Sequence, residues 1–172
     1  MTDLTVDHKA IARRLLRMEG LPLEGIDPLA RLLRTAHPLQ LRAGAVLVNE
    51  GEEARDLLFV VRGSIQVHVK DASGQRSDLT ILRAPFLLGH IAIIDAGKRS
   101  ATCEMATDGL VLALPRTRVQ ALVTSTDRGA EVLRDLMLSG MFRQLDQATE
   151  RLRVFLRAHP EVHVELADPD HP

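Results

Sequence analysis

The most informative stretch of this 172-residue sequence is LLGHIAIIDAGKRSAT, residues 87–102. Its pattern predicts a short apolar helical turn, a small loop and a strand. Gly89 permits a close approach to the backbone, and the free amides at a helix start attract anions. Arg99 adds a fixed charge with a planar set of donors, beside which Ser100 and Ala101 place little bulk. The stretch predicts a pocket for one small phosphate; a surface turn with a solvated arginine is the alternative.

Two helices are predicted on the N-terminal side. Residues 7–18 carry apolar side chains at three- and four-residue steps, which is typical of an amphipathic helix. A second helix follows, with Asp27 as its N-cap and Pro28 at its first position. The sequence His37-Pro38 ends it. We expect these helices to form an N-terminal unit over residues 1–37.

Strand patterns fill the next predicted unit, residues 38–115. Apolar residues alternate with polar or small ones, and LLFVV at 57–61 predicts a continuous apolar strand. Turns that contain glycine separate the strands, and two of them, at residues 71–74 and at Asp108-Gly109, are predicted to be hairpin turns. Many short strands with such turns indicate a mainly β fold, a sandwich or a small barrel.

Helices return over residues 116–158. The final helix is predicted to start at a cap formed by Thr126 or Asp127 and to end near Ala158, before Pro160. Residues 132–137 carry an apolar patch suited to packing on the strands. Further along, apolar residues at heptad spacing predict a dimerisation seam, formed by Leu138, Met141, Leu145, Ala148, Leu152 and Phe155. The acidic, proline-containing residues 159–172 are predicted to be disordered.

Composition limits the classes of function. With 22 basic and 23 acidic residues the net charge is −1, which gives no bulk attraction to nucleic acid. No apolar run is long enough for a membrane span, and the first residues lack the pattern of a signal peptide. A single cysteine, Cys103, fits a reducing compartment. We therefore expect a cytoplasmic protein without a nucleic-acid or membrane partner.

Candidates for chemistry other than ligand binding are weak. No nucleophile and base stand in a recognisable arrangement, so we expect no enzyme activity. Three histidines, His159, His163 and His171, fall in the predicted tail without the spacing of zinc ligands, and no metal site is expected. Cys103 is expected to be a small core residue. The sequence does not identify axial ligands for a haem, so no haem is expected.

Four segments together resemble the cyclic nucleotide-binding domain family. They are LRAGAVL at 41–47, EGE at 50–52, LLFVVRGS at 57–64 and the stretch at 87–102. The last resembles the family's phosphate-binding cassette, and its spacing from Gly89 to Arg99 matches the protein-kinase regulatory-subunit type without gaps. The resemblance covers about residues 22–158. It implies an eight-stranded β jelly roll flanked by helices.

The resemblance also implies roles for individual residues. In this family the amides of the short helix and the arginine hold the cyclic phosphate of cAMP or cGMP. Counted along the family pattern, a residue that meets the base from the long helix falls near Gln144. The implied ligand-binding residues of this chain are Gly89, His90, Ile91, Ala92, Arg99, Ser100, Ala101 and Gln144.

Two positions depart from the family pattern. The family has a glutamate after the cassette glycine, which accepts a hydrogen bond from the ribose 2′-hydroxyl, and here the residue is His90. A neutral histidine can accept such a bond, but it is longer and pH-sensitive. A few residues earlier, Pro85-Phe86 stands where the family usually has glycine. Phosphate capture by Arg99 stays the expectation, and capture of the ribose is left open.

Two functional hypotheses follow from the sequence. The first is a stand-alone cyclic nucleotide-binding regulatory module that forms a homodimer through its long helix and acts on an unknown protein partner. The second is a ligand-free dimerisation or interaction module on the same fold. The bacterial transcription regulators of this superfamily continue into a helix-turn-helix after the long helix, and this sequence ends at Pro172. We therefore expect no direct binding to DNA.

Overall fold

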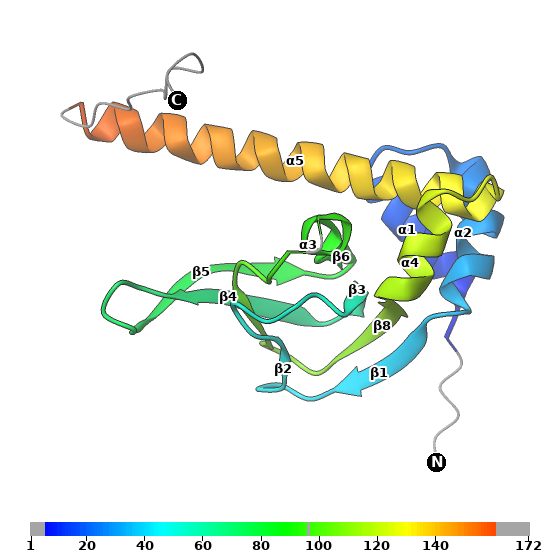
Figure 1. Ribbon diagram of the computed structural model, residues 1–172, viewed down its shortest axis with the longest axis horizontal. Coiled ribbons are helices and arrows are strands. Elements are labelled where there is room, and N and C mark those ends of the chain that lie inside the picture. Colours follow the sequence, from blue (N-terminus) through cyan, green and yellow to red (C-terminus); the bar gives the residue numbers. More distant parts are fainter. Residues whose placement is uncertain (1–5, 96, 161–172) are drawn as a thin grey trace. The chain divides into compact units, whose positions relative to one another are not determined.

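The computed structural model describes residues 6–95 and 97–160 and contains two antiparallel sheets of four strands each (Figure 1). This is the jelly-roll architecture expected from the sequence. One sheet has the strand order β1-β8-β3-β6 and the other β2-β7-β4-β5. The strands are β1 (His37–Leu41), β2 (Val46–Val48), β3 (Asp56–Arg62), β4 (Ser64–Lys70), β5 (Arg76–Arg83), β6 (Phe86–Leu88), β7 (Thr102–Met105) and β8 (Gly109–Pro115).

The helices flank these sheets in chain order. They are α1 (His8–Met18), the 3₁₀ turn η1 (Leu23–Gly25), α2 (Ile26–Leu33), α3 (His90–Ile94), α4 (Arg116–Val123) and α5 (Arg128–Ala158). The chain divides into two compact units, which meet inside α5 between Gly140 and Met141. The first unit holds both sheets and all the other helices.

The first unit has two cores, and the central strands β3 and β8 belong to both. In β3, Leu57, Phe59 and Val61 pack with the helices. The alternate residues Leu58 and Val60 pack between the two sheets. Side chains on successive positions of a strand point to opposite faces. A strand that is buried on both faces must therefore be apolar at every position, which explains the unbroken LLFVV run.

Helix α1 agrees with the prediction, but the start of α2 does not. Asp7 caps α1, because its Oδ1 accepts a hydrogen bond from Ala10 N at 2.9 Å. Asp27 was expected to cap the second helix, yet that helix begins one residue earlier, at Ile26, and is preceded by η1. Asp27 lies in its first turn and pairs instead with Lys9 Nζ at 2.7 Å. The ion pair to α1 is a tertiary contact that local spacing does not reveal.

One of the two predicted hairpin turns is confirmed. Residues 71–74 connect β4 and β5, which pair with each other in one sheet. The prediction for Asp108-Gly109 is wrong, because β7 and β8 on either side of it belong to different sheets. The chain crosses between the sheets there and passes close to Gly63. A Cβ atom on Gly63 would lie 2.9 Å from Asp108 O.

Helix α5 is anchored by its N-terminal part. Asp127, one of the two predicted caps, accepts a hydrogen bond from Gly129 N at 2.8 Å. Arg134 Nη1 donates to the carbonyl oxygens of Leu122, Val123 and Ser125, which satisfies the end of α4. The apolar patch at 132–137, which was expected to pack on the strands, is buried in a core that combines side chains of the helices with those of β3 and β8. Gly140 is the last buried residue of the helix.

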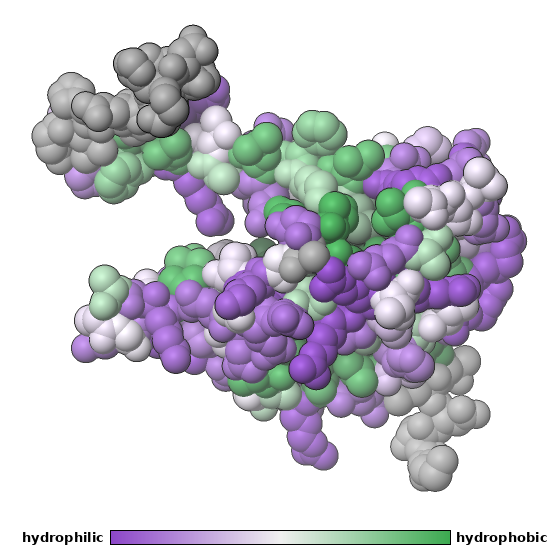
Figure 2. Space-filling view, viewed as in Figure 1, coloured by the Kyte–Doolittle hydropathy of each residue, from purple (hydrophilic) through white to green (hydrophobic). Residues whose placement is uncertain are grey.

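The second unit contains the remainder of α5. Its apolar residues are exposed within the described part of the chain, as the hydrophobic side chains along α5 in Figure 2 illustrate. Phe142 is 66% and Leu145 63% exposed, and Leu152, Val154 and Phe155 are each about half exposed. The predicted tail lies mostly in residues 161–172, outside the described residues, as do His163 and His171.

Candidate functional site

The predicted cassette forms the short helix and the glycine turn that the sequence indicated. Strand β6 leads into Gly89, which has φ +83°, a left-handed conformation that favours glycine. Helix α3 follows, and Ile93 N donates to Gly89 O at 3.1 Å. Ala92 and Ile93 are buried on the inner side of this helix. Because Gly89 has no Cβ atom, a neighbouring side chain can lie directly against its backbone.

That neighbour is Arg99, which both its backbone and its guanidinium hold in place. Its N–H donates to Glu52 O and its carbonyl accepts from Gly51 N, both at 2.8 Å. The side chain is only 6% exposed, and Nη2 donates to the carbonyl oxygen of Asp56 at 2.6 Å. A Cβ atom on Gly89 would overlap Arg99 Nη1. The two residues that the sequence singled out are thus in direct contact, and only glycine leaves room for this guanidinium.

The guanidinium of Arg99 is incompletely satisfied. Its Nε and Nη1 are buried and meet no hydrogen-bond acceptor among the described residues. Burial lowers the pKa of Arg99, while the negative charges of Asp56 and Glu52 act in the opposite direction. Buried donors without acceptors are unfavourable. An oxygen-bearing ligand beside this group would remove that penalty.

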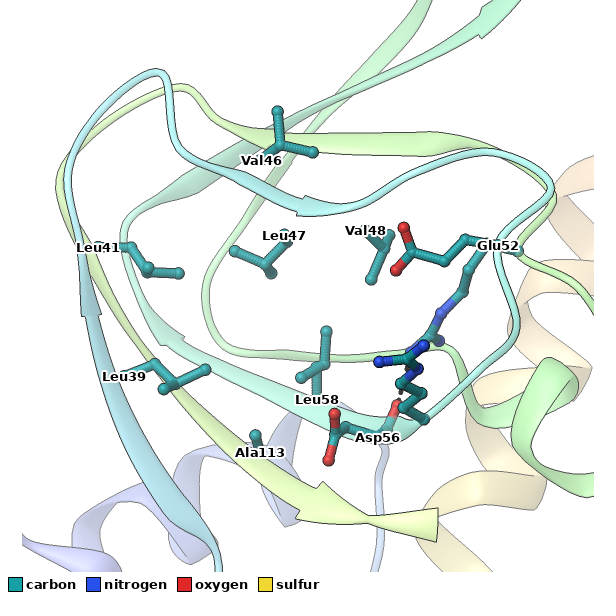
Figure 3. A pocket seen from close by; sticks show the side chains of 11 residues that line it. Leu39, Leu41, Val46, Leu47, Val48, Glu52, Asp56, Leu58 and Ala113 are labelled. Atoms are coloured by element: carbon teal, nitrogen blue, oxygen red, sulfur yellow. Dashed lines mark hydrogen bonds between the residues drawn. The ribbon is translucent and has the colours of Figure 1, made fainter.

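A cavity of about 160 Å³ lies beside Arg99 in the interior of the roll (Figure 3). Figure 3 shows leucine side chains from β1, β3 and the β2 strand pointing into it, with Glu52 and Asp56 toward its other end. Its wall is apolar over most of its extent and charged at one end. The lining residues are Leu39, Leu41, Val46, Leu47, Val48, Glu52, Arg55, Asp56, Leu58, Arg99 and Ala113.

The other predicted site residues are distributed differently. His90 is 6% exposed, and its ring faces α5: a Cβ atom on Gly140 would lie 3.5 Å from His90 Nε2. Ile91 and Ser100 are exposed, and Ala101 is half-buried. Gln144 is exposed on the part of α5 that belongs to the second unit. Their roles toward a ligand stay predictions.

Sequence reasoning missed the acceptor and the cavity around Arg99. Asp56 contributes a backbone carbonyl, a group that every residue carries, so no side-chain pattern could have identified it. Glu52 stands in the EGE segment that carried part of the resemblance, but its closeness to Arg99 depends on the β2–β3 loop. The cavity arises because residues from four strands and two loops converge.

The structure shows the surroundings of Cys103 and of the possible metal ligands among the described residues. Cys103 is buried in β7, and burial raises the pKa of its thiol to about 11. It is therefore protonated at neutral pH and packs as a small apolar residue, which was the expectation. Within residues 6–95 and 97–160 no three His, Cys, Asp or Glu side chains stand close enough to hold a metal ion.

The fold and the site define a class of protein: a jelly-roll domain with flanking helices and a glycine–arginine cassette. The sequence pattern described as "Cyclic nucleotide-binding domain" matches residues 38–126. This chain belongs to that family. A cyclic nucleotide-gated potassium channel of Rhizobium etli is 31% identical over 114 residues, which are 66% of this chain and 30% of the channel. A cAMP-activated global transcriptional regulator of Haemophilus influenzae is 37% identical over 81 residues, 43% of this chain and 36% of the regulator.

Solved structures agree with this assignment. The Thermus thermophilus catabolite activator protein superposes with a TM-score of 0.63 and 26% identity, over 82% of this chain and 62% of that one. A cyclic nucleotide-binding domain from Methylobacillus flagellatus has a TM-score of 0.71 over 92% of this chain and 88% of its own. At 16% identity the second likeness concerns the fold alone.

This chain corresponds to only part of each curated relative. The chain spans about a third of the length of the two curated relatives, whose names describe a channel and a regulator. Among the helices that the structure describes, none combines the length and the apolar character that crossing a bilayer requires.

Proposed function

We propose that this chain is a cyclic nucleotide-binding regulatory module in which Arg99 holds the cyclic phosphate of cAMP or cGMP. The observation that carries the proposal is the buried guanidinium of Arg99 against Gly89, with two donors that lack an acceptor among the described residues. Family membership supports the ligand class. A charge-assisted bond from a partly desolvated arginine to phosphate is worth about 1.5–3 kcal/mol.

The signal would leave the domain through α5. His90 follows Gly89 directly and faces Gly140, the last buried residue of the helix. A ligand that shifts α3 would therefore act on α5 at the end of its anchored part. A ligand shifts the equilibrium between two positions of α3 only if it binds one of them more tightly than the other.

We propose that the exposed part of α5 mediates a homodimer and presents a surface to a protein partner. The single cysteine, buried and protonated, supports a reducing cytoplasmic location.

Calorimetry with cAMP and cGMP tests the ligand. Arg99→Ala should weaken binding about ten- to a hundredfold because the phosphate loses its charged donor. Arg118→Ala is the matched control, since Arg118 is an exposed arginine of α4. His90→Glu introduces the carboxylate that the family uses for the ribose, and it should tighten binding if α3 can present it to the ligand. Circular dichroism of each variant checks folding.

A ligand-free interaction module is the second candidate. It is favoured by the bond from Arg99 Nη2 to Asp56 O, which engages part of the guanidinium without a ligand. If wild type and His90→Glu both fail to bind either nucleotide, the nucleotide proposal is wrong and the interaction module remains.

A further inference from the structure

The guanidinium of Arg99 lies where the side chain of residue 89 would lie if that residue had one. A Cβ atom on Gly89 would overlap Arg99 Nη1 and would be 2.9 Å from Arg99 Cζ. Nε and Nη1 have almost no contact with solvent and meet no acceptor among the described residues. A charge-assisted bond needs an oxygen at about 2.7–2.9 Å from such a nitrogen. Because protein atoms cover both nitrogens, a phosphate oxygen cannot reach them in the position that the structure shows.

The forces on this guanidinium are opposed to one another. Burial lowers the pKa of Arg99, so desolvation acts against the charge, while the negative charges of Asp56 and Glu52 favour it. Nη2 donates to the carbonyl oxygen of Asp56 at 2.6 Å (Figure 3). The other two nitrogens are buried donors without acceptors among the described residues, which is unfavourable. A better acceptor at the surface of the protein can therefore compete for the guanidinium.

The backbone of Arg99 is fixed, so its side chain can change position alone. Arg99 N donates to Glu52 O, and Arg99 O accepts from Gly51 N, both at 2.8 Å. Rotation of the side chain from one staggered position to another breaks neither of these bonds. Ser100, the next residue, is exposed, so the chain lies at the surface at this point. The guanidinium can reach solvent from there without a movement of the main chain.

We propose that the contact of Arg99 with Gly89 and Asp56 O is an autoinhibitory inward position, and that the guanidinium must leave Gly89 before it binds a cyclic phosphate. This inference rests on the proposed function, because it concerns how the same arginine meets the same ligand. The apparent affinity for the nucleotide is then reduced by the fraction of molecules in which the guanidinium points outward. A change that stabilises the inward position lowers the affinity without touching the ligand.

Phenylglyoxal, a reagent for accessible arginine side chains, tests the inward position without a nucleotide. The reagent attacks only the outward fraction, so Arg99 of the full wild-type chain should react at least about tenfold more slowly than Arg118. Arg118 is an exposed arginine of α4. Mass spectrometry of the peptides gives both rates. Equal rates at Arg99 and Arg118 would overturn the inward position.

Two glycine variants test the role of Gly89. Gly89→Ala places a Cβ atom on the guanidinium and should raise the rate at Arg99 at least about tenfold. Gly74→Ala is the matched control, because Gly74 has φ +81° and nothing within 4 Å of its Cβ position, and it should leave the rate unchanged. Circular dichroism checks the fold of both variants. An unchanged rate in folded Gly89→Ala, or an equal rise in both variants, would overturn the assignment to Gly89.

Nuclear Overhauser effects between the Gly89 Hα protons and Arg99 Hε follow the guanidinium in the wild type and need no substitution. They should be present without nucleotide, because the guanidinium lies against Gly89, and should be lost when cAMP saturates the chain. Their absence without nucleotide would overturn the inward position, and their persistence in the cAMP complex would overturn its autoinhibitory role. If neither cAMP nor cGMP binds, the proposed function itself is wrong. If a nucleotide binds and the effects persist, only the present inference is wrong.

Discussion

Gly89 leaves the space in which the guanidinium of Arg99 lies, because its side chain is a single hydrogen atom. Its φ of +83° and the guanidinium beside it both exclude a Cβ atom. We predict that Gly89→Ala lowers the free energy of unfolding by more than Gly74→Ala does. Gly74 has φ +81° and nothing within 4 Å of its Cβ position, so it reports the backbone strain alone, about 1–2 kcal/mol. Urea denaturation of both variants gives the difference. Equal values would mean that Arg99 moves aside freely.

The carboxyl group of Asp71 is expected to make a pH-dependent contribution to stability. Its Oδ1 accepts from Ser73 Oγ at 2.6 Å, Ser73 N at 2.8 Å and Gln75 N at 3.0 Å. These bonds favour the ionised carboxylate and hold the pKa of Asp71 below its ordinary value of 3.8, with the Ser73 hydroxyl as the largest cause. A lowered pKa stabilises the fold above pH 3.8, and this contribution is lost as the pH falls through the folded-state pKa.

An NMR titration of the carboxyl group measures this effect. The pKa of Asp71 should lie below 3.8 in the wild type and rise in Ser73→Ala. The control is Ser77→Ala, a serine of β5 outside the turn. A pKa of Asp71 that is identical in wild type and Ser73→Ala would contradict the role of the hydroxyl.

The residues of the site were predictable to different degrees. Gly89 and Arg99 could be paired because the glycine, the short apolar helix and the arginine stand in one local segment. The sequence identified His90 as unusual. It did not reveal that the ring of His90 faces Gly140, because that contact joins positions fifty residues apart. The acceptor for Arg99 is a backbone carbonyl of another strand. Sequence patterns report side chains and short spacings, so they do not reveal such an acceptor.

At the scale of elements, α5 offers a test through its glycines. Gly140 lies within the helix, where glycine is less favourable than alanine by about 0.5–1 kcal/mol. A Cβ atom there would meet His90 Nε2 at 3.5 Å, an ordinary contact. We predict that Gly140→Ala stabilises the protein by about 0.5–1 kcal/mol and increases its helical signal.

Gly129 on the same helix provides a control of opposite sign. A Cβ atom at Gly129 would lie 2.9 Å from Asp127 Oδ1 and 3.0 Å from Pro28 O. Gly129→Ala should therefore destabilise the protein although it also improves helix propensity. Thermal unfolding followed at 222 nm compares the two. A destabilised Gly140→Ala would show that the contact with His90 leaves no room.

Elements were predicted well where one local signal determines them. The long helix, its Asp127 cap and the hairpin at residues 71–74 are examples. The two errors, Asp27 and Asp108-Gly109, have one cause. An N-cap and a hairpin turn are recognised from a few adjacent residues. The pairing of Asp27 with Lys9 and the passage from one sheet to the other depend on distant segments.

At the scale of the whole molecule, the exposed apolar residues of α5 predict self-association. The heptad seam includes Leu145, which is 63% exposed, and Phe155, which is 47% exposed. Paired helices bury such seams in a coiled coil. We predict that the wild type sediments as a dimer at tens of micromolar and that Leu145→Asp sediments as a monomer. Gln147→Asp adds the same charge at an exposed position outside the seam and should remain dimeric. A monomeric wild type would contradict the prediction.

The anchoring of α5 up to Gly140 has a mechanical consequence. Burial stops at that residue, while the helix itself continues to Ala158. At about 1.5 Å per residue the remaining helix is about 27 Å long. His90 therefore faces α5 at the residue where the buried part of that helix ends. Any rearrangement of α3 that a ligand causes would reach α5 at that residue, where the segment with the exposed apolar side chains begins.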